Sequence, residues 1–272
     1  MKKQQFTVGE YAAGRFLVPA NFADKIRVLV IGCGGSGSEM IDALVRFHHS
    51  ARGIGHAGLE LTVQDGDSVS ATNVGRARFL PSDVGLNKAE LLARRYGQLF
   101  GMPIRAISHA CTKRGIRQLS EFFDLAITCV DKASFRVQVA DYWCNRPTQT
   151  TWLDLGNGSY TGQVVLGSLG LSSTPRLPNS VQLFPSVRTA SDDDAPSCSM
   201  EEALKSQSLF VNRFAVDVAV SMLWRLLAEG YIENHGALFD MRGITVKPIP
   251  VNHATWQFFG FQASPQETRL AA

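Results

Sequence analysis

The residues best suited to chemistry form a glycine-rich run that directly follows a short apolar segment. Its four glycines have the spacing of a phosphate-binding loop: Gly32, Gly34, Gly35 and Gly37. Glycines permit a tight turn and let backbone N–H groups approach a phosphate at the N-terminus of the following helix. Residues 25–31 predict a buried strand before the loop, and residues 38–48 predict a helix after it. This context favours a nucleotide-binding loop over a plain strand-to-helix turn.

A second group of polar residues follows the next predicted strand, at residues 59–63. Asp65 comes at the end of this strand, where a carboxylate can accept hydrogen bonds from ribose hydroxyls. The planar guanidinium of Arg76 suits phosphate oxygens, and Lys88 adds a point charge. The residue types that suit a triphosphate are gathered here: Asp67, Asn73, Arg76 and Lys88. A nicotinamide-dependent dehydrogenase does not need this set, so that class is a distant alternative.

Asp131 ends another predicted strand, at residues 125–130. In an open α/β sheet, ligands bind at the carboxyl ends of the strands. A carboxylate at this edge suits Mg²⁺, which proteins hold through one or two carboxylates together with phosphate oxygens. Each residue also has a structural alternative, since Asp131 could cap a helix beginning near Ser134, and Arg76 and Lys88 could be solvated surface charges. Their joint occurrence favours the nucleotide site.

Four motifs between residues 28 and 136 resemble the ThiF/MoeB family, which includes the ubiquitin-activating enzymes: G-x-G-G-x-G, D-x-D-x-V-x-x-x-N-x-x-R, G-x-x-K and V-D-x-x-x-x-R. The resemblance implies that Asp65 binds the ribose of ATP, that Asp131 acts through Mg²⁺, and that Arg136 is structural or lies near the adenine. The phosphates would be contacted by Asn73, Arg76 and Lys88. The implied reaction is attack of the C-terminal carboxylate of a ubiquitin-like or sulfur-carrier protein on the α-phosphorus of ATP, which releases pyrophosphate.

The resemblance also implies partners. The carrier protein would end in glycine, a conjugating enzyme could act downstream, and relatives form homodimers. Related enzymes often borrow an arginine from the N-terminal segment of the partner subunit. Arg15 is the nearest candidate here, although it lies closer to the glycine loop than in the family. The zinc-binding CxxC pairs of many relatives are missing, so ATP and Mg²⁺ are expected and zinc is not.

The second half of the chain resembles a narrower group, the ThiF-type protein of bacterial PRTRC gene cassettes. The resemblance rests on Pro196-Ser197-Cys198-Ser199, on Glu202-Ala203-Leu204, on Gln207 and Asn212, and on a closing Phe-Gly.

Cys198 is the predicted nucleophile for a thioester step. It ends a Ser-, Pro- and Asp-rich segment at residues 168–197 that shows little periodic structure, and it precedes a predicted long helix over residues 201–229. The positive end of a helix dipole lowers the pKa of a thiol and favours the thiolate. The alternative is a small residue in a helix cap. The other cysteines have poorer settings: Cys33, Cys111, Cys129 and Cys144.

Strands and helices alternate along the chain, which predicts a doubly wound, mainly parallel Rossmann-like α/β sheet of the ThiF type with a C-terminal extension. Further strands are predicted at residues 104–109, 151–155, 163–166, 237–240 and 244–248, and further helices at 88–99 and 134–144. The expected organisation is an N-terminal segment (1–24) that could hold a short helix, a nucleotide-binding core (25–167), a crossover loop with Cys198 (168–199), helix and strands that complete the same domain (200–262), and a tail (263–272).

Composition narrows the function classes. The 272 residues carry a formal net charge of +3 and no block of Lys or Arg, which argues against a nucleic-acid partner. No apolar run approaches the roughly 20 residues of a membrane helix. Five scattered cysteines indicate a reducing compartment, and we expect a cytoplasmic protein without membrane contact. Two alternatives stay open: an adenylating enzyme for a small or tRNA-linked carboxylate, and a catalytically silent nucleotide-binding scaffold.

Overall fold

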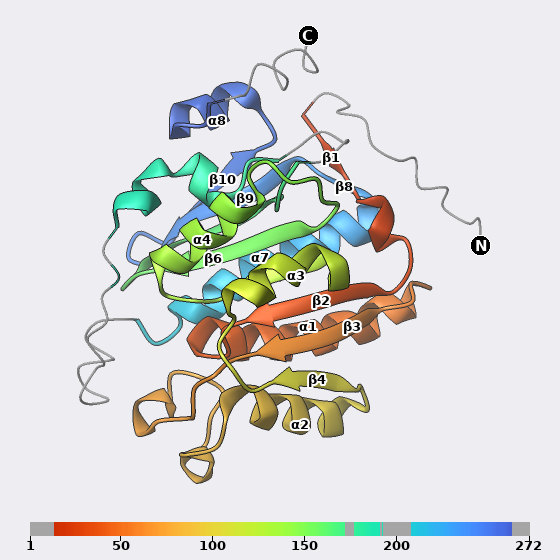
Figure 1. Cartoon of the computed structure of the whole chain (residues 1–272), viewed down its shortest axis with the longest axis vertical. Coiled ribbons are helices and arrows are strands. Elements are labelled where there is room, and N and C mark those ends of the chain that lie inside the picture. The colour runs from red at the N-terminus through yellow and green to blue at the C-terminus, as the bar shows by residue number, and fades with distance from the viewer. Residues whose placement is uncertain (1–13, 172–176, 191, 193–207, 263–272) are drawn as a thin grey trace.

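The computed structural model describes residues 14–171, 177–190, 192 and 208–262, and these residues contain one eight-stranded sheet (Figure 1). Its order is β10-β9-β7-β6-β5-β2-β3-β4. The strands are β2 (Ile26–Ile31), β3 (Leu59–Gln64), β4 (Ile104–Ile107), β5 (Leu125–Thr128), β6 (Thr151–Asn157), β7 (Thr161–Ser168), β9 (Asn234–Asp240) and β10 (Thr245–Pro250). A separate antiparallel pair joins β1 (Phe16–Leu17) to β8 (Tyr231–Ile232).

Five strands, β2 to β6, run parallel to one another. The chain begins this half at β2 in the middle of the sheet, proceeds outward to β4, and then returns to place β5 on the other side of β2. The strand order therefore reverses between β2 and β5, and such a switch point is where open α/β sheets bind ligands. The predicted doubly wound, mainly parallel fold is confirmed.

The remaining strands extend the sheet beyond β6 in antiparallel fashion. β7 forms a hairpin with β6, β9 pairs with β7, and β10 pairs with β9 at the sheet edge. Residues 151–168 and 234–250 thus belong to the same sheet as the parallel strands. This antiparallel half lies beside the switch point and adds a surface to one side of it.

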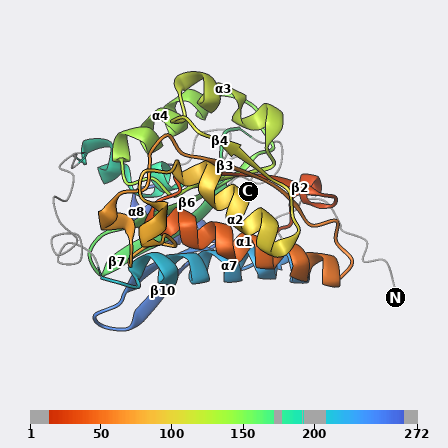
Figure 2. The same ribbon diagram turned by 90° about the horizontal axis from the view of Figure 1, so that it is seen from below.

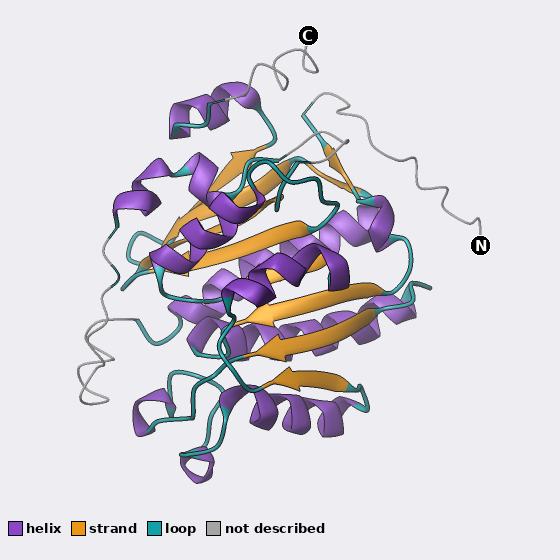
Figure 3. Ribbon diagram, in the orientation of Figure 1, coloured by secondary structure: helices purple, strands orange, loops and turns teal. Residues whose placement is uncertain are grey.

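Helices cover both faces of the sheet (Figures 2 and 3). Three of them, α1 (Gly35–Gly53), α2 (Lys88–Phe100) and α7 (Val211–Glu229), lie on one face, where α1 packs along α7. The other face carries α3 (Lys113–Phe122), α4 (Ala133–Trp143) and the short α5 (Ser180–Leu183). Because β2 is covered on both faces, Val28 to Ile31 are all buried, as the continuous apolar run predicts.

Local sequence signals set the ends of several helices. The side chain of Asn87 accepts a hydrogen bond from the N–H of Glu90 and caps α2, which ends at Gly101 in a left-handed conformation. Gly230 ends α7 in the same way. The start of α2 is thereby held next to the loop that follows β3. Among the described residues, no helix combines the length and apolar character that crossing a membrane requires.

The structure differs from the sequence prediction in five places. The segment over residues 168–197, which was expected to show little periodic structure, contains the short α5 and a 3₁₀ helix (Pro185–Thr189). Residues 208–210 form a turn, so a continuous helix over 201–229 is wrong in this part, and α7 begins at Val211. The described part of the N-terminal segment holds β1 and a 3₁₀ turn instead of an α-helix. Helices α3 and α8 (His253–Phe259) were not predicted.

Candidate functional site

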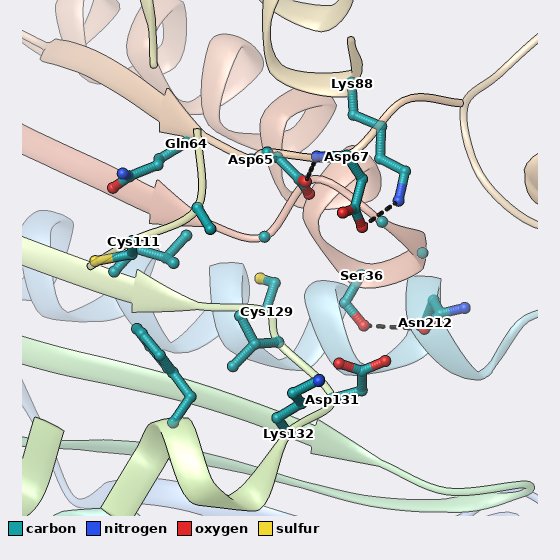
Figure 4. Close-up of a pocket in the computed structure, with 18 of the residues that line it drawn as sticks. Ser36, Gln64, Asp65, Asp67, Lys88, Cys111, Cys129, Asp131, Lys132 and Asn212 are labelled. Carbon is teal, nitrogen blue, oxygen red and sulfur yellow. Dashed lines mark hydrogen bonds and ion pairs between the residues drawn. The ribbon is translucent and has the colours of Figure 1, made fainter. Parts of the chain in front are cut away.

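A cavity of about 480 Å³ opens at the carboxyl ends of β2, β3 and β5, and its size is that of a nucleotide or cofactor site (Figure 4). We call it the nucleotide cavity. Most of the residues predicted from the sequence line it: Gly32, Gly34, Gly35, Asp65, Asp67, Asn73, Arg76, Lys88, Asp131 and Arg136. Gly37 does not line it, and Cys198 lies outside the described residues. Residues spread over a hundred positions therefore meet at the switch point of the sheet.

The glycine loop needs its glycines for three different reasons. Gly32 has a φ of 89°, and a Cβ there would lie 2.8 Å from the carbonyl oxygen of Cys129. A Cβ on Gly37 would overlap the carbonyl oxygen of Gly32, so this glycine lets α1 pack tightly onto the strand it follows. A Cβ on Gly35 would meet the amide of Asn212 at 2.5 Å. Gly34 has open space around its Cβ position, on the side of the cavity.

Asp65 ties the end of β3 to the glycine loop. Its Oδ2 accepts a hydrogen bond of 2.6 Å from the backbone N–H of Cys33, and its Oδ1 accepts one of 2.8 Å from the N–H of Asp67. A carboxylate oxygen has a second lone pair, so both oxygens can still accept from a ligand hydroxyl. The two backbone contacts hold the carboxylate in one orientation toward the cavity.

Lys88 approaches from the first residue of α2. Its Nζ lies 3.1 Å from Oδ2 of Asp67, and the lysine side chain is largely buried whereas the aspartate is exposed. Asn87 donates from Nδ2 to the carbonyl oxygens of Asp65 and Asp67. The capping residue of α2 therefore also fixes the loop after β3, and it places the Lys88 ammonium group over the cavity.

Asn73 and Arg76 are carried by the turn around the 3₁₀ helix η2 (Ala71–Asn73). The Asn73 side chain is buried and accepts from the N–H of Ser70 at 3.0 Å through Oδ1. Arg76 donates from Nε to the carbonyl oxygen of Thr72 at 3.1 Å. Both side chains are thus anchored to their own turn, and both residues line the cavity.

Arg136 lies in the first turn of α4, directly after the turn that carries Asp131. Its Nε lies 2.9 Å from Oδ1 of Asp154, and both side chains are buried. Its guanidinium also donates to the carbonyl oxygens of Val130 and Leu155, at 2.6 and 2.8 Å. These bonds hold the turn that carries Asp131 against β6. Of the two roles considered for Arg136, the structural one accounts for its contacts.

A polar cluster that sequence reasoning missed closes the far side of the cavity. Oδ1 of Asn212 accepts from Oγ of Ser36 at 2.9 Å and from Nδ2 of Asn157 at 2.9 Å. The three side chains come from the starts of α1 and α7 and the end of β6. Asn212 is part of the pattern shared with the narrower group, but nothing in its sequence setting indicates a place in the site.

Further lining residues were also not predicted, namely Gln64, Cys111, Lys132 and Phe135. Lys132 follows Asp131 in the chain, and nothing in the sequence distinguishes it from an ordinary lysine on the protein surface.

A model of the ThiF family matches residues 21–255 of the chain. This chain belongs to the ThiF family.

Solved structures share the fold of this chain. E. coli MccB with ATP is similar to this chain with a TM-score of 0.59 at 16% identity, over 85% of this chain and 65% of MccB. PaaA is similar with a TM-score of 0.54 at 13% identity, over 84% of this chain and 65% of PaaA. The chain therefore spans just under two thirds of the length of these structures, and at such low identity the likeness concerns the fold. Among curated proteins, none matches the chain.

Four cysteines of this ThiF-family chain lie among the described residues, and two of them, Cys111 and Cys129, line the nucleotide cavity. Burial raises the pKa of the Cys129 thiol well above its usual range and raises that of Cys111 to about 11. Burial, together with the nearby charge of Asp65, also raises the pKa of Cys33. A thiol with a raised pKa stays protonated and is a poor nucleophile. Cys144, the fourth, is exposed and does not line the cavity.

The donor set suits Mg²⁺ bound together with a nucleotide. Within the described ranges, no three His, Cys, Asp or Glu side chains gather into a group that could hold a metal ion by themselves. Asp131 lines the cavity as one carboxylate on the wall after β5, and Asp65 and Asp67 line the wall after β3. Mg²⁺ in nucleotide sites takes one or two carboxylates and fills its other positions with phosphate oxygens and water. The residues present fit that mode of binding.

Proposed function

We propose that this ThiF-family protein uses ATP and Mg²⁺ to adenylate the C-terminal carboxylate of a ubiquitin-like or sulfur-carrier protein. The observation that carries the proposal is the convergence of the glycine loop, Asp65, Arg76, Lys88 and Asp131 on one cavity at the switch point of the sheet. Support also comes from E. coli MccB, which has been solved with ATP and with MccA. The narrower membership in the PRTRC group stays a prediction.

In this proposal each wall of the nucleotide cavity has its own task. The Asp65 carboxylate, held by the N–H groups of Cys33 and Asp67, accepts hydrogen bonds from the ribose. The backbone at the N-terminus of α1 receives phosphate oxygens. Asn73, Arg76 and Lys88 contact the β- and γ-phosphates, and Mg²⁺ held by Asp131 would neutralise phosphate charge.

The reaction proposed is direct displacement at phosphorus. A carboxylate oxygen of the carrier forms a bond to the α-phosphorus, the bond from that phosphorus to the bridging oxygen of pyrophosphate breaks, and pyrophosphate leaves with the electron pair. The product is an acyl adenylate. Because no proton needs to move, the protein contributes by positioning the two anions and stabilising charge. The bonds of Arg136 to Asp154 serve this end, since they hold the turn with Asp131 in place.

A second hollow supplies a route for the carrier. It measures about 590 Å³, shares Arg136, Gly156 and Asn157 with the nucleotide cavity, and continues over β7, β9 and β10. We call it the tail groove; it is also lined by Ala133, Gly158, Gly162, Gln163, Leu238 and Lys247. Its lining includes Gly158, where the nearest atom to a Cβ position lies 3.9 Å away, so an extended chain can approach the backbone at this point. Such a groove suits a C-terminal tail that ends in small residues.

We extend the proposal to a thioester at Cys198. The last described residue before it, Asp192, accepts a hydrogen bond from the N–H of Ser134 at 3.1 Å, at the start of α4 and beside Asp131. On the other side, the N–H of Ser208 bonds to the carbonyl oxygen of Ser159 at 2.7 Å. Residues 193–207 lie outside the described residues, so the thioester at Cys198 stays a prediction from the sequence.

In that step the thiolate sulfur attacks the acyl carbon, and AMP leaves as the carbon–oxygen bond to its phosphate breaks. The described cysteines that line the cavity have raised pKa values, which makes them poor substitutes. The homodimer, a conjugating enzyme and a cytoplasmic location remain predictions of the family resemblance and of composition.

The test is co-incubation of the protein with ATP, Mg²⁺ and a small protein that ends in glycine, followed by intact mass spectrometry. The proposal predicts a covalent adduct that a thiol reductant removes and that is absent in Cys198→Ser. An adenylated carrier without any covalent adduct on the protein would support adenylation and exclude the thioester at Cys198. Turnover with a free small carboxylate or an RNA-linked one would favour that substrate class, and ATP binding without any adenylate would indicate a silent scaffold.

A further inference from the structure

Cationic side chains face the nucleotide cavity from different walls. In the part of the chain that the structure describes, they are Arg76, Lys88, Lys132 and Arg136. Lys88 has its charge offset by Asp67 at 3.1 Å, and Arg136 directs its guanidinium at the buried Asp154 and at backbone carbonyls. The proposed reaction brings a second anion, the carrier carboxylate, to an ATP that is already highly charged. A cation is therefore needed at the place where the two anions meet.

Lys132 lies in the nucleotide cavity, close to the tail groove. Its chain neighbour Asp131 lines only the nucleotide cavity, and its other neighbour Ala133 lines only the tail groove. Lys132 itself lines the nucleotide cavity and is the residue that precedes the first turn of α4. Figure 4 shows it on the same wall as Asp131, with its side chain rising toward the cavity. Its backbone carbonyl oxygen accepts a hydrogen bond of 3.4 Å from Arg136, which lines both hollows, so Lys132 lies in the nucleotide cavity next to the route proposed for the carrier.

We infer that Lys132 is a further catalytic residue of the proposed adenylation, on which this inference rests. Its ammonium group contacts a carboxylate oxygen of the carrier and an oxygen of the α-phosphate, and it holds the two anions in line for attack. The carboxylate–phosphorus bond forms as the bond to pyrophosphate breaks, and Lys132 exchanges no proton in this step. Charge interactions gain strength in a site that excludes water, and the N-terminus of α4 adds a favourable dipole on the same side.

A different role for Lys132 must be separated from this one. Asp192 bonds to the backbone N–H of Ser134 in the first turn of α4, so its carboxylate lies close to Lys132. Lys132 could then act only by holding the segment that leads to Cys198. Asp192→Asn tests this role, because an asparagine keeps an oxygen that can accept from the Ser134 N–H and removes the charge.

The experiment measures carrier-dependent exchange of labelled pyrophosphate into ATP and, separately, the dissociation constant of ATP. The variants are Lys132→Ala, Lys132→Arg and Asp192→Asn, with Lys113→Ala as a control for loss of an exposed lysine elsewhere. Removing a group that stabilises transition-state charge costs about a hundredfold in rate. We expect that loss in Lys132→Ala at saturating substrates, with little change in ATP affinity and in the thermal unfolding midpoint. Lys132→Arg should recover part of the rate, and Asp192→Asn and Lys113→Ala should match the wild type.

Three results would overturn the inference while the proposed function stands: wild-type exchange in Lys132→Ala, an equal loss in Asp192→Asn, or a loss that appears only as weaker ATP binding. Failure of the proposed function is distinguishable, because the wild-type protein itself would then show no exchange with any carrier.

Discussion

Oδ1 of Asp154 lies 2.9 Å from Nε of Arg136, and both side chains are buried between the end of β5, α4 and β6. Because these charges are out of water, removing one partner leaves the other uncompensated. Arg136→Ala should therefore lower the free energy of unfolding by about 3–5 kcal/mol, as measured by urea denaturation. Arg136→Lys should recover little of it, since an ammonium group cannot reach Asp154 and two backbone carbonyls together. The account would be contradicted if Arg136→Ala lowered the free energy of unfolding by less than Arg225→Ala, which breaks the exposed pair Arg225–Glu229.

The glycine loop provides a matched pair of substitutions. Gly37→Ala places a methyl group onto the carbonyl oxygen of Gly32, whereas Gly34→Ala meets open space. We expect Gly37→Ala to destabilise the fold by about 1–3 kcal/mol, the cost of overpacking, and Gly34→Ala to leave the unfolding midpoint unchanged. Because Gly34 lines the cavity, its methyl group should instead weaken ATP binding. Equal stability of the two variants would show that α1 does not pack on β2 as described.

Asp65 should control nucleotide affinity more than stability. In Asp65→Ala, the ribose loses its acceptor and the N–H of Cys33 loses its partner. Hydrogen bonds to charged groups contribute about 1.5–3 kcal/mol, so the dissociation constant of ATP should rise by roughly ten- to a hundredfold. Isothermal titration calorimetry measures it, with Asp24→Ala, an exposed aspartate, as the control. An unchanged affinity would remove Asp65 from the proposed ribose contact.

Much of the parallel half and its site could be predicted, because the signals are local. Apolar runs mark β2, β3 and β5, and Gly32, Asp65 and Asp131 follow closely on their ends. The cluster of Ser36, Asn157 and Asn212 could not be predicted, since its hydrogen bonds join residues 121 and 176 positions apart. Helix α3 could not be predicted, because it buries only Ile116 and Leu119 within a largely polar sequence and therefore shows little apolar periodicity. Helix α5 could not be predicted either, because its four residues make a single turn, which is too short to show a helical repeat of apolar residues.

A buried histidine predicts how stability depends on pH. His235 is a residue of β9, and its ring packs edge-on against Trp256 of α8. Its Nδ1 is hydrogen-bonded to the carbonyl oxygen of Leu166 at 2.7 Å, and burial lowers its pKa to about 4. In the unfolded chain the pKa is about 6.5. The unfolded state therefore binds a proton first as the pH falls, so stability is full above pH 6.5 and declines toward pH 4 by about 3 kcal/mol.

Urea denaturation at a series of pH values measures this decline, and His235→Gln should lack the part that comes from the imidazole. A decline of the same size in His235→Gln would assign the pH dependence to other groups.

The most direct measurement of the central claim is carrier-dependent exchange of labelled pyrophosphate into ATP. The account predicts exchange by the wild-type protein with a small protein that ends in glycine, and its near abolition in Arg76→Ala and Asp131→Asn while both variants unfold at the wild-type temperature. Removal of Mg²⁺ by a chelator should stop the exchange, and re-addition should restore it. Wild-type rates of exchange in folded Arg76→Ala and Asp131→Asn would contradict the assignment of this cavity as the site of adenylation.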